Sequence, residues 1–371
     1  MKILALDMGK CKTVWCEYQD ESTRPIYGKV ATTPQALHDL LVERGPDRLV
    51  LEVGPAAGWV CDLAEAMKIA TQVANPNHEA WRWRNVKKKT DRADGLKLAQ
   101  LSAVGQLPLV HMPAARTRQW RSLIGYREVL VDRRTAVKNH IRAIYERQGL
   151  RLPSAKKAWT QTAIAEWSKD ARALSEVSME ELWRGELHVE WENLKQVEKA
   201  VAEVEQKLTE LAEADERCRR LRTAPSVGPR LSEIVVALVD DPKRFDSGKE
   251  VGAYAGLTPR QWQSGESDRQ GHISRAGNAQ LRRILVQVAW LGVRNKTWML
   301  QVYERVKRGS DKRKKVAIIA VARRLLVRLW AMLRDETDWH ECHEPGKDAE
   351  AIASVGASPQ TPGFIALGAS S

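Results

Sequence analysis

The sequence lacks the features of secreted, disulfide-linked and membrane-spanning proteins. Its five cysteines are scattered over 371 residues with no Cys-x-x-Cys pair, so neither a disulfide framework nor a thiolate zinc site is indicated. No apolar run approaches the roughly 20 residues that a membrane helix needs, and Asp7 interrupts the N-terminal segment where a signal peptide stays apolar. We therefore expect a cytoplasmic protein with no membrane partner.

Phenylalanine is scarce compared with tryptophan, and acidic residues are fewer than basic ones. There are 2 Phe against 14 Trp, and 47 acidic residues against 60 Lys and Arg, which gives a net charge of +13. Such a positive field usually serves a polyanionic partner such as DNA or RNA, with an anionic membrane surface as the rival explanation. The 43% of hydrophobic residues is enough to build cores, and the length predicts two or three domains.

The N-terminal part has the pattern of a mixed α/β sheet. Apolar runs at 3–7, 13–18, 26–32, 48–53 and 69–76 predict strands, and the segments 34–43 and 56–67 have helical periodicity. Three successive strands followed by alternating helix and strand predict hairpins beside parallel crossovers.

The rest of the chain reads as mainly helical. A long basic helix is expected over 114–148, with a polar side available for phosphates. Apolar residues then alternate at spacings of three and four in a coiled-coil period, at Leu194, Val197, Val201, Val204, Leu208 and Leu211. This helical coiled-coil arm can bury its stripe by self-association or in a hairpin with the 114–148 helix. Beyond it, LRTAPSVGPRLSEIVVALV has the pattern of a helix-hairpin-helix-like element that aims backbone N–H groups at phosphate.

Four carboxylates form a candidate metal site. Asp7 and Glu52 each end a predicted strand, whereas Asp91 and Asp94 lie three apart at the start of a helix and share its face. Converging acids repel one another unless they hold cations such as Mg²⁺. Taken singly, each has an ordinary alternative as a turn residue, a helix N-cap or a partner of the helix dipole.

A basic and aromatic segment immediately precedes Asp91. Trp81 and Trp83 alternate with basic residues in it, and the tryptophans suit either base stacking or burial in a strand. The cations that we expect to grip nucleic-acid phosphates here are Arg82, Arg84, Lys87, Lys88 and Lys89.

Two sets of motifs resemble one known family. LALDMGK, LVLEVG, VANP and KKTDRADGLKLAQ are similar, in order and spacing, to the RuvC-like domain of the DEDD insertion-sequence transposases, which include the Piv-type invertases and the bridge-RNA-guided recombinases. APSVG, FDSGKEVGAYAGLTPRQWQSG and ISRAGNAQLRRIL resemble that family's second conserved domain. The hairpin departs from the pattern, because it reads Pro-Ser-Val-Gly where many relatives carry Pro-Gly-Ile-Gly.

The resemblance implies a domain plan and a set of partners. It implies an RNase H-like (RuvC-like) nuclease domain at 1–150 and a mainly α transposase domain at 221–335. The apolar periodicity predicts a helical coiled-coil linker at 151–220 between them, and the composition after Asp335 predicts a disordered tail at 336–371. The expected partners are donor and target DNA, an element-encoded guide RNA, and further copies of the chain in a dimer or tetramer joined through the coiled coil.

The resemblance also implies roles for single residues. Asp7, Glu52, Asp91 and Asp94 would bind two Mg²⁺ ions, with Mn²⁺ able to substitute, and Ser264 would be the nucleophile. Ser-Gly is otherwise an ordinary loop dipeptide, and Ser267 and Ser274 compete with Ser264 for the role. The cations expected to meet nucleic acid around the serine loop and on the exposed face of the following helix are Arg260, Arg269, Arg275, Arg282 and Arg283, joined by His272.

Three functions follow, in order of preference. The first is a site-specific DNA recombinase with a covalent phosphoserine intermediate. The second is a Mg²⁺-dependent nuclease of the junction-resolvase type, in which the C-terminal domain only binds. The third is a nucleic-acid-binding scaffold whose acids merely cap helices.

Overall fold

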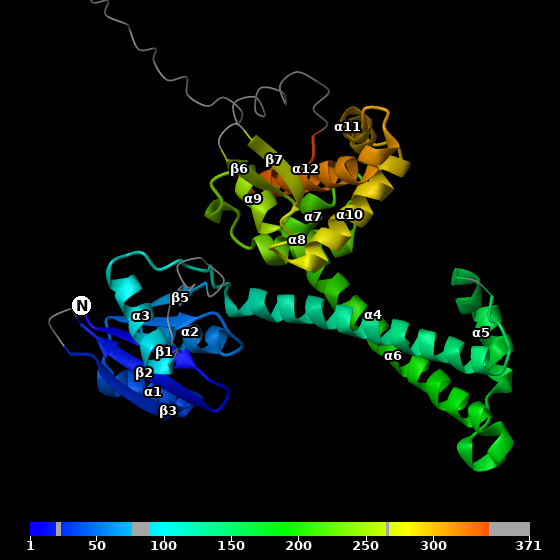
Figure 1. The fold of residues 1–371 in the computed structure, drawn as a ribbon, viewed down its shortest axis with the longest axis horizontal. Coiled ribbons are helices and arrows are strands. Elements are labelled where there is room, and N and C mark those ends of the chain that lie inside the picture. Colours follow the sequence, from blue (N-terminus) through cyan, green and yellow to red (C-terminus); the bar gives the residue numbers. More distant parts are fainter. Residues whose placement is uncertain (20–23, 76–89, 154, 265–266, 341–371) are drawn as a thin grey trace, which may run out of the picture. The chain divides into compact units, whose positions relative to one another are not determined.

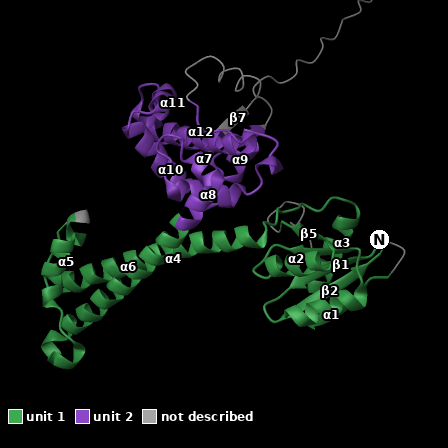
Figure 2. Cartoon of the chain, turned by 180° about the vertical axis from the view of Figure 1, so that it is seen from behind, with its two compact units in different colours: residues 1–209 green, residues 210–371 purple. Residues whose placement is uncertain are grey.

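The computed structural model describes residues 1–19, 24–75, 90–153, 155–264 and 267–340. The chain divides into two compact units, residues 1–209 and 210–371 (Figure 2). Arg82, Arg84, Lys87, Lys88 and Lys89 lie outside the described residues, as does the chain after 340. In the part that is described, no helix is both long and apolar enough to cross a membrane.

Unit 1 begins with a five-stranded sheet of order β3-β2-β1-β4-β5 (Figure 1). Its strands are β1 (Ile3–Met8), β2 (Lys12–Tyr18), β3 (Ile26–Ala31), β4 (Arg48–Glu52) and β5 (Ala70–Ala74). The first three strands pair antiparallel, whereas β1, β4 and β5 are parallel neighbours connected through the helices α1 (Pro34–Arg44) and α2 (Ala57–Ala66). The predicted mixed α/β sheet is confirmed.

The two faces of this sheet have separate cores. Alternate residues of a strand point to opposite faces, so Leu4 and Leu6 of β1 pack with residues of α1 and α2. Ile3 and Ala5 of the same strand pack instead with Leu98 of α3 (Asp91–Ala103). The second face, covered by α3, is the one that carries the candidate site.

Two 33-residue helices, α4 (Ala115–Arg147) and α6 (Leu182–Ala214), form an arm and run antiparallel (Figure 1). Ion pairs connect the two helices. Arg127 Nε lies 2.8 Å from Glu205 Oε1, and Lys138 Nζ lies 2.9 Å from Glu198 Oε1. Leu194, Val201 and Leu208 of the predicted stripe are at most 4% exposed within the single chain. The hairpin between the two helices is therefore the arrangement present. Arg127 and Lys138 of α4 are engaged by acids of α6, whereas Arg116 and Arg133 remain exposed.

The tip of the arm is built from the tryptophan-rich segment between α4 and α6. Between α4 and α6 lie α5 (Gln161–Trp167) and four short 3-10 turns, η2 (Ala155–Trp159), η3 (Ser168–Asp170), η4 (Leu174–Glu176) and η5 (Met179–Glu181). Tyr145 is fully buried, meets Trp167 edge to face at 5.2 Å, and donates its hydroxyl to the Trp167 carbonyl. The aromatic residues thus close the end of the hairpin with a small core of its own.

Unit 2 is mainly helical, as predicted, with one small sheet. Its elements are α7 (Glu216–Leu221), α8 (Pro229–Val239), η6 (Pro242–Arg244), α9 (Gly248–Tyr254), β6 (Pro259–Ser264), β7 (Ser267–Ile273), α10 (Ala279–Arg294), α11 (Trp298–Lys307), η7 (Asp311–Arg313) and α12 (Lys314–Asp335). The central helix α12 contacts α7, α8, α9, α10 and α11, and its residues from Ala317 to Leu333 supply much of the core.

The turn between α7 and α8 contains the departure noted in the sequence. Ser226 has φ +66°, in the left-handed region that glycine adopts without strain and other residues rarely enter. The glycine that many relatives carry at this position thus has a conformational reason. Ser226 adopts the same backbone conformation although it has a side chain. Gly228 follows as the N-cap of α8, with Pro229 in the first turn.

We expected the folded part of the chain to end at Asp335, but the chain remains packed on unit 2 beyond that residue. The backbone N–H of Trp339 donates to Thr223 Oγ1 (2.8 Å), and its ring stacks on Trp298 at 5.6 Å. The guanidinium of Arg328 lies over both rings. Residues 336–340 therefore belong to the folded unit, because an aromatic stack that the apolar periodicity does not reveal holds them there.

Candidate functional site

Asp7 and Glu52 occupy corresponding positions at the ends of neighbouring parallel strands. The register of β1 and β4 pairs Leu6 with Leu51, and the next residue of each strand is one of the two acids. By alternation, Asp7 shares a face with Ala5, and Glu52 shares a face with Val50. Since Ala5 and Val50 lie in the core beneath α3, both carboxylates belong to the α3 side of the sheet.

Helix α3 crosses the face of the sheet to which these two acids belong. At its C-terminal end, Arg48 at the start of β4 donates to the carbonyl and hydroxyl oxygens of Ser102 (3.1 and 3.3 Å), and Ser102 Oγ donates to Gln72 of β5 (2.7 Å). Its N-terminal turns lie instead over β2 and β3, because Arg92 lies over the Tyr27 ring and Gly95 approaches Cys16.

The first turn of α3 carries Asp91 and Asp94. Thr90 is the N-cap and accepts a hydrogen bond from the Ala93 N–H (3.3 Å), which fixes where the helix begins. Asp94 is 9% exposed and lies one turn before the buried Leu98, on the sheet side of the helix, whereas Asp91 is exposed. The first turn of α3 thus carries one exposed carboxylate, Asp91, and one buried carboxylate, Asp94, on the side of the sheet to which Asp7 and Glu52 belong.

The close approach of α3 to the sheet depends on a glycine. A Cβ atom at Gly95 would lie 3.3 Å from Cβ of Cys16 on β2, so the helix leaves little room for a side chain there. Burial raises the pKa of the Cys16 thiol to about 11, and this cysteine is therefore protonated near neutral pH and is no nucleophile.

The donor set fits a divalent cation in its chemistry. Carboxylate oxygens are the ligands that Mg²⁺ and Mn²⁺ prefer, and the fold places all four carboxylates on one side of the sheet. Within the described residues, however, no three His, Cys, Asp or Glu side chains are close enough together to hold one ion. The four carboxylates therefore do not form a closed ligand set in this structure.

Ser264 ends the strand β6 in unit 2. The antiparallel partner β7 begins at Ser267, which pairs with Ser264 across the end of the hairpin. The prediction of a loop around the serine was wrong, because Arg260, Arg269 and His272 all lie in strands. The segment contains few β-branched residues, so its strand pairing was not evident from local preference.

Two glycines allow the hairpin to be joined tightly to the rest of unit 2. A Cβ at Gly277 would lie 1.9 Å from the carbonyl oxygen of Tyr254, and a Cβ at Gly256, where φ is +65°, would lie 2.9 Å from the Ala276 nitrogen. The segments around Gly256 and Gly277 thus meet in a close backbone contact, the glycine crossing, in which the Arg275 N–H donates to the Gly256 carbonyl (3.2 Å). Asn278 then caps α10 by accepting from the Leu281 N–H (2.8 Å).

Replacing Gly277 by Ala should disrupt this crossing. The methyl group would overlap a backbone oxygen that cannot rotate away, and such overpacking costs up to about 3 kcal/mol in free energy of unfolding. Urea unfolding followed by circular dichroism measures the loss. Gly228→Ala is the matched control, because a Cβ there meets nothing within 4 Å, and its cost should stay near 1 kcal/mol or less. Equal unfolding midpoints for the two variants would contradict the role of the crossing.

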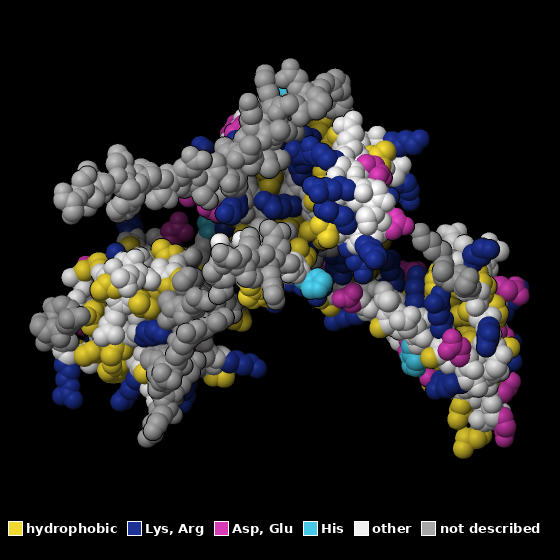
Figure 3. Space-filling model, turned by 45° about the horizontal axis from the view of Figure 1, so that its top comes forward, with side chains coloured by type: hydrophobic (Ala, Val, Ile, Leu, Met, Phe, Trp, Pro, Cys, Tyr) yellow, Lys and Arg dark blue, Asp and Glu magenta, His cyan; other side chains and the backbone are white. Residues whose placement is uncertain are grey.

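The arginines around the hairpin divide into structural and exposed groups. Arg282 was expected on an exposed face, but it is half-buried, and its Nη1 donates to the carbonyls of Ala255 (3.1 Å) and Gly277 (2.7 Å). Desolvation, with a contribution from the charge of Arg275, lowers the pKa of Arg282. The cations of unit 2 that remain exposed include Arg260, Arg275, Arg283, Lys296, Lys312 and Lys315. Lys and Arg side chains gather on the face of unit 2 seen in Figure 3.

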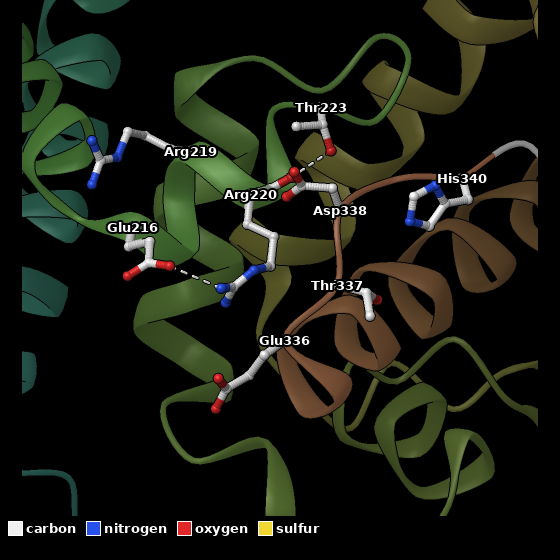
Figure 4. A pocket seen from close by; sticks show the side chains of 8 residues that line it. All are labelled: Glu216, Arg219, Arg220, Thr223, Glu336, Thr337, Asp338 and His340. Atoms are coloured by element: carbon white, nitrogen blue, oxygen red, sulfur yellow. Dashed lines mark hydrogen bonds and ion pairs between the residues drawn. The ribbon is translucent and has the colours of Figure 1, made fainter.

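A separate pocket lies between α7 and the segment 336–340 that follows α12. Its volume is about 490 Å³, and Figure 4 shows the eight residues that line it, Glu216, Arg219, Arg220, Thr223, Glu336, Thr337, Asp338 and His340. Arg220 pairs with Glu216 at 3.0 Å. The three acids balance the cations, so the pocket has no charge bias towards phosphate and is not assigned to the site.

Comparison with known families defines the class first. Residues 4–147, which contain the four carboxylates, match a DEDD family model described as "Transposase", and residues 218–304, which contain Ser264, match the model "Transposase IS116/IS110/IS902 family". The two models together span both units and describe one kind of enzyme, a transposase. The chain belongs to the IS110-type family of insertion-sequence transposases, whose members act on DNA.

Curated relatives agree with this family. The chain is 27% identical over 346 residues to the transposase for insertion sequence element IS1111A of Coxiella burnetii, and the match covers 91% of each chain. A probable family 20 transposase of Pseudomonas aeruginosa is 29% identical, with 70% of this chain and 75% of the relative covered. The pilin gene-inverting protein of Moraxella lacunata is 26% identical over 67% of each.

Proposed function

We propose that the protein is a site-specific DNA recombinase of an insertion sequence, with a carboxylate metal site in unit 1 and a serine nucleophile in unit 2. The observation that carries the proposal is the alignment of Asp7 with Glu52 at adjacent parallel strand ends, beneath a helix whose first turn supplies Asp91 and Asp94. The similarity to a gene-inverting protein supports recombination as the outcome rather than cleavage alone.

The carboxylates would hold two Mg²⁺ ions, with Mn²⁺ able to substitute. Such ions, when bound, neutralise charge on the phosphodiester and stabilise the attacking and leaving oxygens. Asp94 is buried on the sheet side of α3, whereas Asp91 is exposed at the helix start. This difference suits a buried residue that fixes one position and an exposed residue that adapts to incoming DNA.

Ser264 would attack the phosphorus of the DNA backbone. Its hydroxyl loses a proton as Oγ forms a new O–P bond, one ester P–O bond breaks, and the departing sugar oxygen takes up a proton in exchange. The phosphoserine keeps the energy of the broken ester, so attack by a sugar hydroxyl reverses the step and rejoins DNA without ATP. Exposed Arg260 and Arg275, together with Arg269 on β7, would neutralise charge on the reacting phosphate.

Partners beyond DNA remain part of the proposal. A guide RNA encoded by the element would account for a net charge of +13, which exceeds what contact with DNA alone requires. A dimer or tetramer would let the serine of one copy meet the carboxylates of another. Because α4 already covers the apolar stripe of α6, this association would use a surface other than that stripe.

The proposal is tested by capture of the protein-DNA adduct on a denaturing gel. The full chain is incubated with DNA carrying the element ends, in Mg²⁺, in Mn²⁺ or in EDTA, and the adduct is digested and analysed by mass spectrometry. We expect a phosphorylated Ser264 peptide with either metal and none in EDTA. DNA cut in Mg²⁺ with no adduct would favour the resolvase-type nuclease instead.

A further inference from the structure

The hairpin that bears Ser264 also presents an exposed tryptophan. Trp262 of β6 is 58% exposed, more than Trp290 of α10 at 44%. We propose that Trp262 is a stacking platform for a DNA base next to the phosphate that Ser264 attacks, and that it thereby positions the strand for cleavage. The location of the base rests on the proposed function of Ser264, whereas the stacking itself does not.

The ring of Trp262 is held in place without being buried. It packs over Gly271 of β7, where a Cβ atom would lie 2.4 Å from Cζ3 and 2.9 Å from Cη2. Any side chain at 271 would push the indole away, so the glycine makes room for the ring against its own hairpin. An exposed aromatic surface supported in this way suits stacking, because less conformational freedom is lost when a base packs on it.

The spacing along β6 places this ring near the proposed nucleophile. Trp262 lies two residues before Ser264, and residues two apart in a strand belong to the same face, roughly 7 Å apart along the strand. This distance is similar to the step between successive nucleotides of an extended single strand. A base on Trp262 would therefore belong to a nucleotide flanking the phosphate at Ser264.

The surroundings fit a nucleic acid rather than an apolar partner. The neighbours Arg260, Gln261 and Gln263 on β6 are all exposed, as are His272 and Arg275. Apolar partners bury contiguous apolar surface, whereas a lone aromatic ring among cations and amides is the arrangement of a single-strand-binding surface. Since the family acts on DNA, we assign the occupant to the DNA strand, and not to RNA.

Binding of fluorescein-labelled single strands to the full-length protein in EDTA tests this inference. The probes are a short oligothymidine, an abasic strand of equal length and an oligouridine. Stacking is worth roughly 1–3 kcal/mol per base, so Trp262→Ala should weaken oligothymidine binding about 10-fold or more. Trp262→Phe should recover most of it, and binding of the abasic strand should be unchanged in both.

Gln263→Ala is the matched control, because this exposed neighbour belongs to the opposite face of β6. It should bind every probe as the wild type does. Unchanged oligothymidine binding by Trp262→Ala, or an equal loss with the abasic strand, would overturn the inference. A loss confined to oligouridine would assign the ring to RNA and would also overturn it. Ser264→Ala should leave oligothymidine binding intact, so the stacking surface is judged separately from the nucleophile.

Discussion

Ser264→Ala is expected to abolish the covalent protein-DNA species and strand transfer together. Removal of the hydroxyl takes away the group proposed to form the O–P bond, and loss of a nucleophile costs an enzyme at least about 10³-fold in rate. The measurement is adduct yield on a denaturing gel, with strand transfer followed on the same DNA.

The neighbouring serines supply the controls. Ser267 pairs with Ser264 across the hairpin, and Ser274 accepts from the Ala276 N–H (3.4 Å) in the glycine crossing. Ser267→Ala and Ser274→Ala should each retain the adduct. If Ser264→Ala still cuts DNA in Mg²⁺ at the wild-type rate, the chain is a nuclease of the resolvase type and the serine mechanism is wrong.

Asp7→Asn and Glu52→Gln should each reduce Mg²⁺-dependent cleavage by about 10³-fold. Both changes keep the shape of the side chain but remove a charge that a metal-bound phosphate needs for its ions. Isothermal titration with Mn²⁺ should show weakened metal binding in the same variants. Folding should change little, since both acids are only half-buried at strand ends.

Asp39→Asn provides the control for loss of an acidic charge. Asp39 is exposed on α1, the helix that covers the opposite face of the sheet, and its replacement should leave cleavage and Mn²⁺ binding unchanged. Wild-type DNA processing by Asp7→Asn without any need for Mg²⁺ would favour the scaffold reading, in which the acids serve only as caps.

Local sequence pattern predicted the N-terminal layer well. The strands ending at Asp7 and Glu52 and the helix beginning after Thr90 follow from apolar alternation and capping, which operate over a few residues. The hydrogen bonds of Ser102 with Arg48 and Gln72, which orient that helix, connect residues 54 and 30 positions apart. No local pattern contains them.

The C-terminal site was harder to predict from the sequence, because its contacts also join distant residues. Gly256 and Gly277 are required by a backbone contact between segments about twenty residues apart, and their types alone suggest only turns. Arg282 looked exposed by helical periodicity, yet the same crossing draws it onto two carbonyl groups. Trp262 was not singled out, although one aromatic residue within a polar strand is a signal that could have identified it.

The strand β1 serves folding on one face and chemistry on the other. Leu4 and Leu6 are sealed beneath two helices, whereas the opposite face, which ends in Asp7, is covered by the single helix α3. Tolerance to substitution should therefore alternate along this strand near its C-terminal end. Changes at Leu6 would lower the amount of protein that accumulates in cells. Changes at Asp7 would leave that amount intact but would abolish movement of the element.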